Sequence, residues 1–338
     1  MNLVTAGHRN LDDLTSLAQQ WQALWQRVPG AMPFQHPAWL IAWWEVFAPG
    51  DLFVISAWRE GRLVGMAPLY REVGKLGERI LPLGISVSDY LDLLLHPDYA
   101  DAAGEALIAH LLRADLPWSE WELPELSAEA SALRLTCPPA LADEQAPQSI
   151  CPMLTLPRTI DGLSEVIPSR KRRKLRMARN RAGRRSSFAI ERVTTGDVDE
   201  AFTALFKFHR ARWHHDGETG VLADPRARAF HRTTMARLND AGIARIYRLT
   251  LEGQTAGIYY GFLSGTEAYA YLGGFSCDCS FESPGTLLIG HAIEEAVREG
   301  AQHFHFLRGD EAYKFEWGAT EQWTVRRVLR RVAADALA

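Results

Sequence analysis

The sequence predicts an α+β protein of two tandem domains that share one architecture, a mixed central sheet flanked by helices. The motif Glu-Gly-x-x-x-Gly stands at residues 60–65 and again at 252–257. Identical side chains also pair across the two halves: Tyr90 with Tyr271, Gly104 with Gly285, and His110 with His291. Repeats this far apart indicate duplicated domains rather than a solenoid, whose units span roughly 20–50 residues. The length of 338 residues fits two such domains.

Hydrophobic periodicity and turn signals predict the elements of each half. In the first half we expect helices at 11–25, 37–47 and 101–113, and strands at 52–58, 63–70, 90–95 and near Trp121. In the second half we expect helices at 169–185, 197–215, 224–239 and 285–299, and strands at 243–250, 255–263, 267–275 and 303–307. Segment 137–157 is rich in Pro and Ala and reads as a linker, which predicts domains at 1–145 and 146–338.

The composition is that of a folded protein, with 47% hydrophobic and 23% charged residues. No apolar run approaches the ~20 residues that span a bilayer, and the N-terminus lacks a signal peptide pattern. We therefore expect a cytoplasmic protein. The four cysteines show neither a disulfide framework nor a complete set of metal ligands, so we expect free thiols and no metal.

The net charge of −4 conceals one strongly basic element. Ten Lys or Arg and no acidic residue lie between Arg170 and Arg185. Such a helix is either a solvated face or a phosphate contact, because ten like charges repel one another unless anions neutralise them. It is also the one feature that favours a nucleic-acid-binding protein, although no RNA-binding or helix-turn-helix motif accompanies it.

Two segments of the second half carry side chains suited to chemistry. The expected strand 267–275 leads through a loop to Ser283-Pro284-Gly285-Thr286, where the unpaired N–H groups of a helix start suit a pyrophosphate. The expected strand 303–307 is followed by Asp310, Tyr313 and Lys314. A helix start of this kind also opens many ordinary helices. It indicates a binding site only in combination with the residues that follow the expected strand 303–307.

With these motifs the sequence resembles the tandem GNAT acyltransferases associated with bacterial cellulose and exopolysaccharide biosynthesis. The resemblance rests on five segments: 34–44, 169–173, 208–213, 283–285 and 307–318. The same architecture is similar to the Fem-type aminoacyl transferases that build peptidoglycan bridges. One departure is Ser276–Cys279, where the pattern calls for Asp-Pro.

The resemblance implies acetyl-CoA or another acyl-CoA as donor, without a metal. Its implied binding residues are Gly273, Gly274, Phe275, Ser283, Pro284, Gly285 and Thr286. Tyr313 is the implied acid that protonates the leaving thiolate, and Asp310 and His209 are the candidate bases. Lys314 is expected to hold a phosphate or an acceptor carboxylate.

The acceptor is expected to be an amine or hydroxyl of a sugar, an amino acid or a cell-envelope precursor. Part of the basic helix is expected to contact a phosphate, either of CoA or of a nucleotide-linked or lipid-linked acceptor. The first half lacks the helix start and the acid, so it is expected to bind no CoA and to form one wall of an acceptor cleft. Candidate acceptor contacts are Arg170, Arg172, Arg173, Trp213, Arg308, Asp89 and Asp92, the two aspartates being equally suited to capping strand ends. The alternative reaction is Fem-type transfer from aminoacyl-tRNA.

Overall fold

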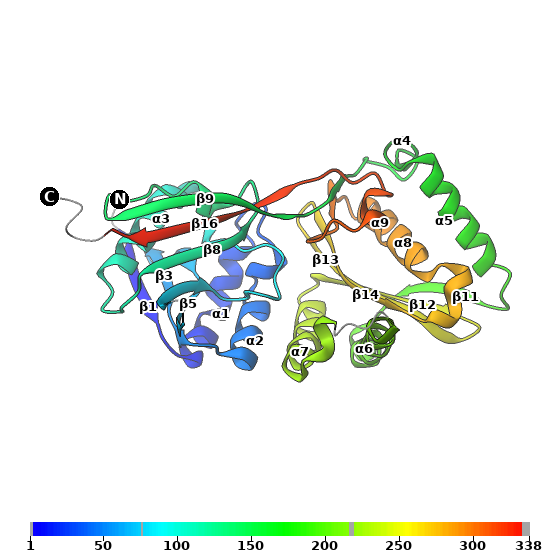
Figure 1. Ribbon diagram of the computed structural model, residues 1–338, viewed down its shortest axis with the longest axis horizontal. Helices are drawn as coiled ribbons and strands as arrows, with labels where there is room; N and C mark the ends of the chain where they lie inside the picture. The colour runs from blue at the N-terminus through cyan, green and yellow to red at the C-terminus, as the bar shows by residue number, and fades with distance from the viewer. Residues whose placement is uncertain (1–2, 76, 216–219, 333–338) are drawn as a thin grey trace. The chain divides into compact units, whose positions relative to one another are not determined.

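The computed structural model describes residues 3–75, 77–215 and 220–332, without the side chains of 212–215 and 221. The chain divides into two compact units (Figure 1). The first comprises Met1–Ser149 and Trp323–Ala338, and the second comprises Ile150–Gln322. Both combine helices with sheets, so the predicted α+β class is confirmed. The expected contiguous division at 145/146 differs from these units, because the last strand of the chain returns to the first one.

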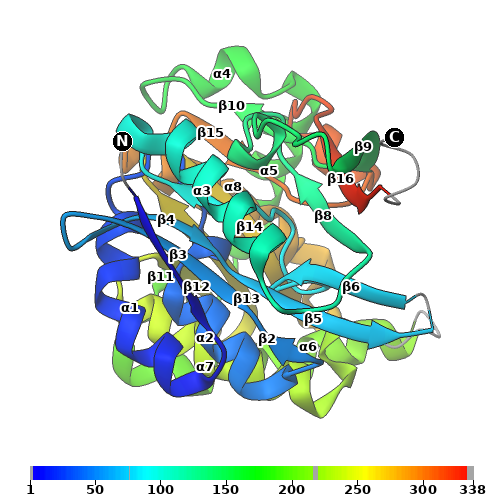
Figure 2. The same cartoon turned by 90° about the vertical axis from the view of Figure 1, so that its left-hand side faces the viewer.

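The first unit contains a four-stranded and a six-stranded sheet. The smaller sheet has the order β1 (Val4–His8), β3 (Val54–Arg59), β4 (Arg62–Ala67), β7 (Leu94–Leu95). The larger has the order β2 (Asp51–Leu52), β5 (Leu69–Gly74), β6 (Gly77–Pro82), β8 (Glu120–Leu126), β16 (Trp323–Arg331), β9 (Leu141–Ile150). Helices α1 (Leu11–Trp25) and α3 (Ala100–Arg113) both contact β4, and α2 (Pro37–Phe47) packs on α1 (Figure 2).

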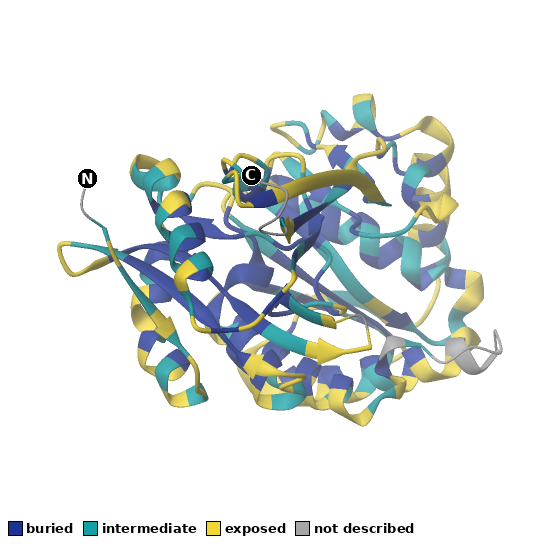
Figure 3. Ribbon diagram, turned by 60° about the vertical axis from the view of Figure 1, so that its left-hand side comes forward, coloured by how far each residue is buried: buried dark blue, intermediate teal, exposed yellow. Residues whose placement is uncertain are grey.

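The second unit has one six-stranded mixed sheet. Its order is β10 (Met153–Thr155), β15 (His303–His305), β14 (Glu267–Phe275), β13 (Gln254–Ser264), β12 (Ala244–Leu251), β11 (Phe188–Arg192). Figure 1 shows α5 (Ser169–Ala182) and α8 (Pro284–Arg298) on one face, and α6 (Val198–His215) and α7 (Pro225–Asp240) on the other. Short helices α4 (Leu163–Val166) and α9 (Ala312–Phe315) complete the unit. Figure 3 shows mostly buried strands, with exposed residues on the outer sides of the helices.

The repeated motif makes the same hairpin in both units. Glu60 and Gly61 join β3 to β4 with φ of 50° and 75°, and Glu252 and Gly253 join β12 to β13 with φ of 53° and 76°. Two successive residues with positive φ match the right-handed twist of the flanking strands, and glycine at the second position adopts this conformation without strain.

The last glycine of the motif lets a helix approach the following strand. A Cβ on Gly65 would lie 3.0 Å from the Ala103 Cβ of α3, and one on Gly257 would lie 2.9 Å from Leu288 Cδ1 of α8. A side chain at either position would crowd the helix that packs on the strand. The repeat therefore encodes both a turn and a helix–strand contact.

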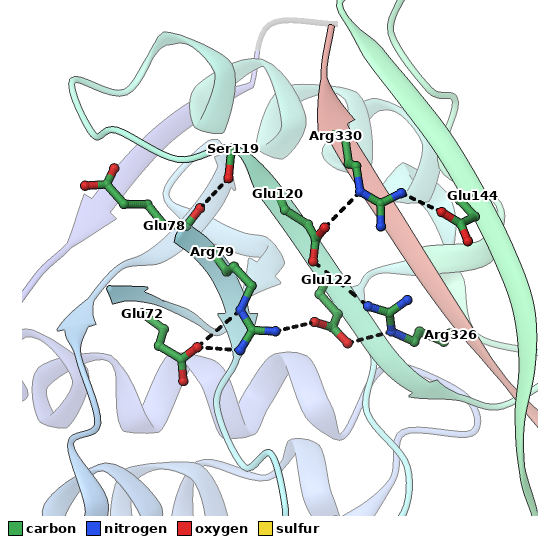
Figure 4. A network of polar contacts seen from close by, with 9 residues as sticks. All are labelled: Glu72, Glu78, Arg79, Ser119, Glu120, Glu122, Glu144, Arg326 and Arg330. Atoms are coloured by element: carbon green, nitrogen blue, oxygen red, sulfur yellow. Dashed lines mark hydrogen bonds and ion pairs between the residues drawn. The ribbon is translucent and has the colours of Figure 1, made fainter. Parts of the chain in front are cut away.

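Four strands of the first unit, β1, β6, β9 and β16, are absent from the sequence expectations, and the last two have clear physical reasons. β9 lies within the expected linker, and most of its side chains are exposed, so it has no alternating apolar pattern. β16 pairs with β8, and its arginines form ion pairs across the sheet (Figure 4). Arg326 Nε lies 2.6 Å from Glu122 Oε1, and Arg330 Nε lies 2.9 Å from Glu120 Oε2. These pairs help to fix the C-terminal strand in the first unit.

Candidate active site

A cavity of about 440 Å³ lies in the second unit where two parallel strands separate. β14 pairs with β15 only from Glu267 to Tyr269, and then continues to Phe275 while β15 ends at His305. The free edge of β14 has backbone N–H and C=O groups that an extended ligand can pair with. The lining of the cavity is largely apolar, and two glycines belong to it. It includes Ile258, Ala270, Leu272, Gly273, Gly274, Phe275, Leu288 and Ile289.

The start of α8 contributes Ser283, Pro284, Gly285 and Thr286 to the same lining, together with Ser280. Ser283 has φ of 55° and ψ of 59°, and its hydroxyl has no capping partner among the described residues. The Ser283 hydroxyl therefore does not cap α8, and the side chain borders the cavity instead. A left-handed conformation is unusual for a residue with a Cβ, and such strain is common at ligand sites.

Gly285 is needed for packing within the unit. A Cβ at this position would lie 2.9 Å from Cε1 of Phe275, which also lines the cavity. By contrast, a Cβ on Gly273 would have Ile258 O, at 3.7 Å, as its nearest described neighbour. Gly273 is therefore the better position for adding a side chain to the cavity wall without disturbing the fold.

Tyr313 lines the cavity from α9, and 42% of its surface is exposed. It shares this wall with Trp317, which is buried. Asp310 is exposed and Arg308 is half-buried on the segment between β15 and α9, and neither borders the cavity. The structure thus brings Tyr313 to the predicted donor residues, 273–275 and 283–286, and leaves Asp310 at the surface.

Lys314 points away from the cavity into the turn that precedes it. Lys314 is 2% exposed, and its Nζ donates to the carbonyl oxygens of Leu307 at 3.1 Å and Gly309 at 3.2 Å. Nζ also lies 2.8 Å from Glu311 Oε2. Lys314 therefore has a structural role in place of the expected contact with a substrate phosphate or carboxylate, because these acceptors already bind its ammonium group.

Lys171 is the charged side chain in the cavity lining, and the sequence analysis did not single it out. Its Nζ lies 3.1 Å from Glu316 Oε2 and 4.5 Å from the ring centre of Trp317. Burial lowers the pKa of Lys171, while the hydrogen bond to Glu316 opposes that shift. The available signal was spacing: Lys171 shares a helical face with Leu175, Ala178 and Ala182, all buried.

His209 lies behind β14, on α6. A Cβ on Gly274 would approach Phe208 Cβ within 3.0 Å and His209 N within 3.3 Å, so this helix packs directly on the strand. His209 is buried and does not belong to the cavity lining. The neighbouring His231 has its pKa lowered to about 3, mainly by burial and secondarily by His209. The side chain of Trp213 lies outside the described residues.

The remaining predicted contacts lie outside the cavity lining. Arg170, Arg172 and Arg173 border a separate surface hollow of about 510 Å³ on α5. In the first unit, Asp89 and Asp92 are half-buried, and Asp92 accepts hydrogen bonds from the N–H groups of Leu93, Ser131 and Ala132 at 2.7–2.8 Å. These bonds give Asp92 the capping role. Burial raises its pKa to about 7 against the opposing pull of these bonds.

No group of three His, Cys, Asp or Glu side chains within the described ranges is arranged to hold a metal ion. The four cysteines are free thiols. Within the same ranges, no helix combines the length and apolar character that crossing a membrane requires.

Residues 169–315 match the family model of the acetyltransferase (GNAT) domain. The protein is a GNAT-fold acyltransferase. The matched range contains almost the whole cavity lining, from Lys171 to Tyr313. A search of curated proteins finds no match.

Three solved structures show the extent of the fold. FemX is 14% identical with a TM-score of 0.70, over 100% of this chain and 98% of FemX. A domain assigned to a lysylphosphatidylglycerol synthetase of Agrobacterium fabrum is 13% identical with a TM-score of 0.56, over 96% and 93% of the two chains. L-PGS from Bacillus licheniformis is 11% identical with a TM-score of 0.56, over 88% and 89%. At these identities the similarity shows the fold alone.

Proposed function

We propose that the protein transfers an acyl group, such as acetyl, from acyl-CoA to an amine or hydroxyl of a cell-envelope or polysaccharide precursor. The observation that carries the proposal is the cavity between β14 and β15, with a helix start and Tyr313 in its wall. Its volume of about 440 Å³ falls within the usual size of small-molecule sites. The relatives named above, FemX and a lysylphosphatidylglycerol synthetase, favour an envelope acceptor.

In this proposal the pantetheine arm pairs with the free edge of β14 and the pyrophosphate meets the N–H groups at the start of α8. The acceptor nitrogen or oxygen attacks the thioester carbonyl, the C–S bond breaks, and Tyr313 gives its proton to the leaving sulfur. Asp310, one of two exposed carboxylates on the segment before Tyr313, takes the acceptor proton through solvent, since it lies outside the cavity lining. The Lys171 ammonium stabilises the negative charge that develops in the apolar cavity.

The test is stabilisation of the full chain by acetyl-CoA, compared between two glycine variants. Gly273→Val fills the cavity wall, whereas Gly196→Val adds the same side chain where no described atom lies within 4 Å. Acetyl-CoA at 100 times its Kd should stabilise the parent and Gly196→Val by about 2.7 kcal/mol, and Gly273→Val hardly at all. Thiol release on addition of amines and sugars then identifies the acceptor.

The second candidate is transfer from aminoacyl-tRNA, which the likeness to FemX and the basic helix favour. It predicts salt-sensitive tRNA binding and no stabilisation of the parent by acetyl-CoA. That pair of results would replace acyl-CoA as the donor.

A further inference from the structure

The cations of α5 and the residues after it fall into two groups. One group is tied to the second unit: Lys171 and Lys174 pair with Glu316, Arg179 with Glu294, and Arg185 with Glu282. Arg181 donates to Phe281 O at 2.9 Å, and Arg172 to Ile167 O at 3.0 Å. These side chains flank the buried face of the helix, so the unit itself neutralises or occupies them.

The other group, which we name the arginine row, consists of Arg170, Arg173, Arg176 and Arg184. All four are exposed, and no acidic side chain among the described residues forms an ion pair with them. A helical repeat of 3.6 residues places Arg173 and Arg176 on the side of α5 opposite Lys171. Arg170 lies at the edge of that side, and Arg184 follows the end of the helix at Ala182. At 1.5 Å per residue, the part of the row on the helix, from Arg170 to Arg176, is about 9 Å long. Figure 1 shows α5 with one side against α8 and no other element of the second unit over its opposite side.

Two apolar side chains lie exposed beside these charges. Met177, within the row, is 43% exposed, and Phe281, in the segment Cys277–Glu282, is 62% exposed. The Arg181 guanidinium stacks over the Phe281 ring at 4.5 Å, which holds that ring beside the helix rather than in the core. Arginines that alternate with exposed apolar side chains are typical of surfaces that lie in the headgroup region of an anionic bilayer.

The arginine row lies apart from the proposed donor site. Lys171, which lines the cavity, faces the opposite way, and the far end of α5 contacts the residues just before Ser283 through Arg181 and Arg185. A phosphate held by the row therefore does not belong to a CoA in the cavity. Because the rest of the chain carries more acidic than basic side chains, an anionic surface attracts this face and repels the remainder.

We propose that the outer face of α5 docks the protein on an anionic lipid surface. The arginine row contacts lipid phosphates, and Met177 and Phe281 enter the headgroup region. In this proposal, the phosphate that Arg170 and Arg173 were expected to contact belongs to a lipid headgroup. This inference goes beyond the proposed reaction and holds whichever donor the cavity takes, because binding is measured without turnover.

The experiment is co-sedimentation of the full chain with phosphatidylcholine vesicles, with and without phosphatidylglycerol. We expect binding to the anionic vesicles only, weakening as salt rises. The triple variant Arg170→Gln/Arg173→Gln/Arg176→Gln should bind roughly 100-fold more weakly, the size expected for three surface cations. The control triple variant Arg27→Gln/Arg62→Gln/Arg113→Gln removes the same charge from exposed positions of the first unit and should bind like the parent.

The variant Met177→Ser/Phe281→Ser should weaken vesicle binding without changing its salt dependence, because it removes apolar contacts and no charge. Equal vesicle binding by the two triple variants would overturn the proposal. So would tight binding of tRNA or inorganic pyrophosphate by the parent together with no vesicle binding, since the row would then serve a soluble anion. Because all substituted side chains are exposed, unchanged melting temperatures verify folding.

Discussion

Lys171 and Lys174 share one carboxylate: their Nζ atoms lie 3.1 Å and 2.7 Å from the two oxygens of Glu316. They stand almost one turn apart on α5, but only Lys171 lines the cavity and lies over the Trp317 ring. The two lysines therefore form a matched pair in which the same charge can be removed inside and outside the candidate site.

Lys171→Met should lower kcat by about 10²-fold, the loss typical of removing one group that stabilises developing negative charge. Methionine retains the packing against Trp317, so the melting temperature should change little. Lys174→Met should retain near-parental turnover. Comparable kinetics for the two variants, measured by thiol release, would remove Lys171 from the mechanism.

The buried position of Lys171 also predicts a pH effect. Burial lowers its pKa from 10.5, so the folded protein loses this proton at a lower pH than the unfolded chain does. If the cation is required, activity falls as pH rises through the lowered pKa, while this group's contribution to folding stability increases with pH over the same interval. Lys171→Arg should move the alkaline loss of activity to higher pH, because a guanidinium stays protonated.

Tyr313→Phe should lower turnover by 10²-fold or more with little change in acetyl-CoA affinity, since the proton donor for the thiolate is lost. Tyr271→Phe is the control, because Tyr271 also lines the cavity and loses the same hydroxyl. Turnover should fall only for Tyr313→Phe. Unchanged turnover in that variant, with the chemical step shown to limit the rate, would make Tyr313 a wall residue.

Ser283→Gly should separate stability from binding. The left-handed backbone of Ser283, with φ of 55°, costs roughly 1–2 kcal/mol, part of which glycine relieves. If the hydroxyl contacts the CoA pyrophosphate, affinity should fall about tenfold while the melting temperature holds or rises. Glu60→Gly relieves the same strain in the first unit, where φ is 50°, and should leave affinity unchanged. Parental affinity in Ser283→Gly, by calorimetry, would rule out the contact.

Arg327→Met tests how the C-terminal strand holds the first unit. Arg327 is 1% exposed, and its guanidinium lies 2.8 Å from both Asp143 Oδ2 and Leu135 O. Its loss leaves these acceptors without their donor and should lower the free energy of unfolding by about 3–5 kcal/mol. Arg326→Gln, which breaks a partly exposed pair on the same strand, should cost less than about 1 kcal/mol. Denaturant titration measures both, and equal losses would contradict the buried anchoring role.

The elements that could be predicted from sequence are those whose signals are local. The helices at 11–25 and 37–47 were predicted with the bounds that the structure shows for α1 and α2, because apolar spacing and helix starts depend on neighbouring residues. The repeated hairpin is likewise local, since Glu-Gly pairs adopt positive φ in both units. The loop after β14 and the start of α8 were placed within one or two residues.

β9 and β16 could not be predicted, because their stability comes from partners distant in the chain. β16 reads as a run of arginines until Glu120 and Glu122 stand across from it in the folded sheet. An exposed edge strand such as β9 needs no apolar alternation, so periodicity does not reveal it. The division into two units depends on these two strands. Because neither strand was predicted, the sequence led to the prediction of a contiguous boundary at 145/146, which differs from the units of the structure.

By itself the sequence determined the α+β class and the repeated hairpin, and it singled out residues 273–275, 283–286 and Tyr313, which line one cavity, because each follows from periodicity or from motifs of a few residues. Only the tertiary structure decided which charged groups face that cavity. Lys314 was expected in the site and lies under three carbonyls, whereas Lys171 was one cation among ten and lines the wall. A lysine side chain can reach solvent or core from nearly the same backbone, so its role is set by the acceptors that folding brings around it.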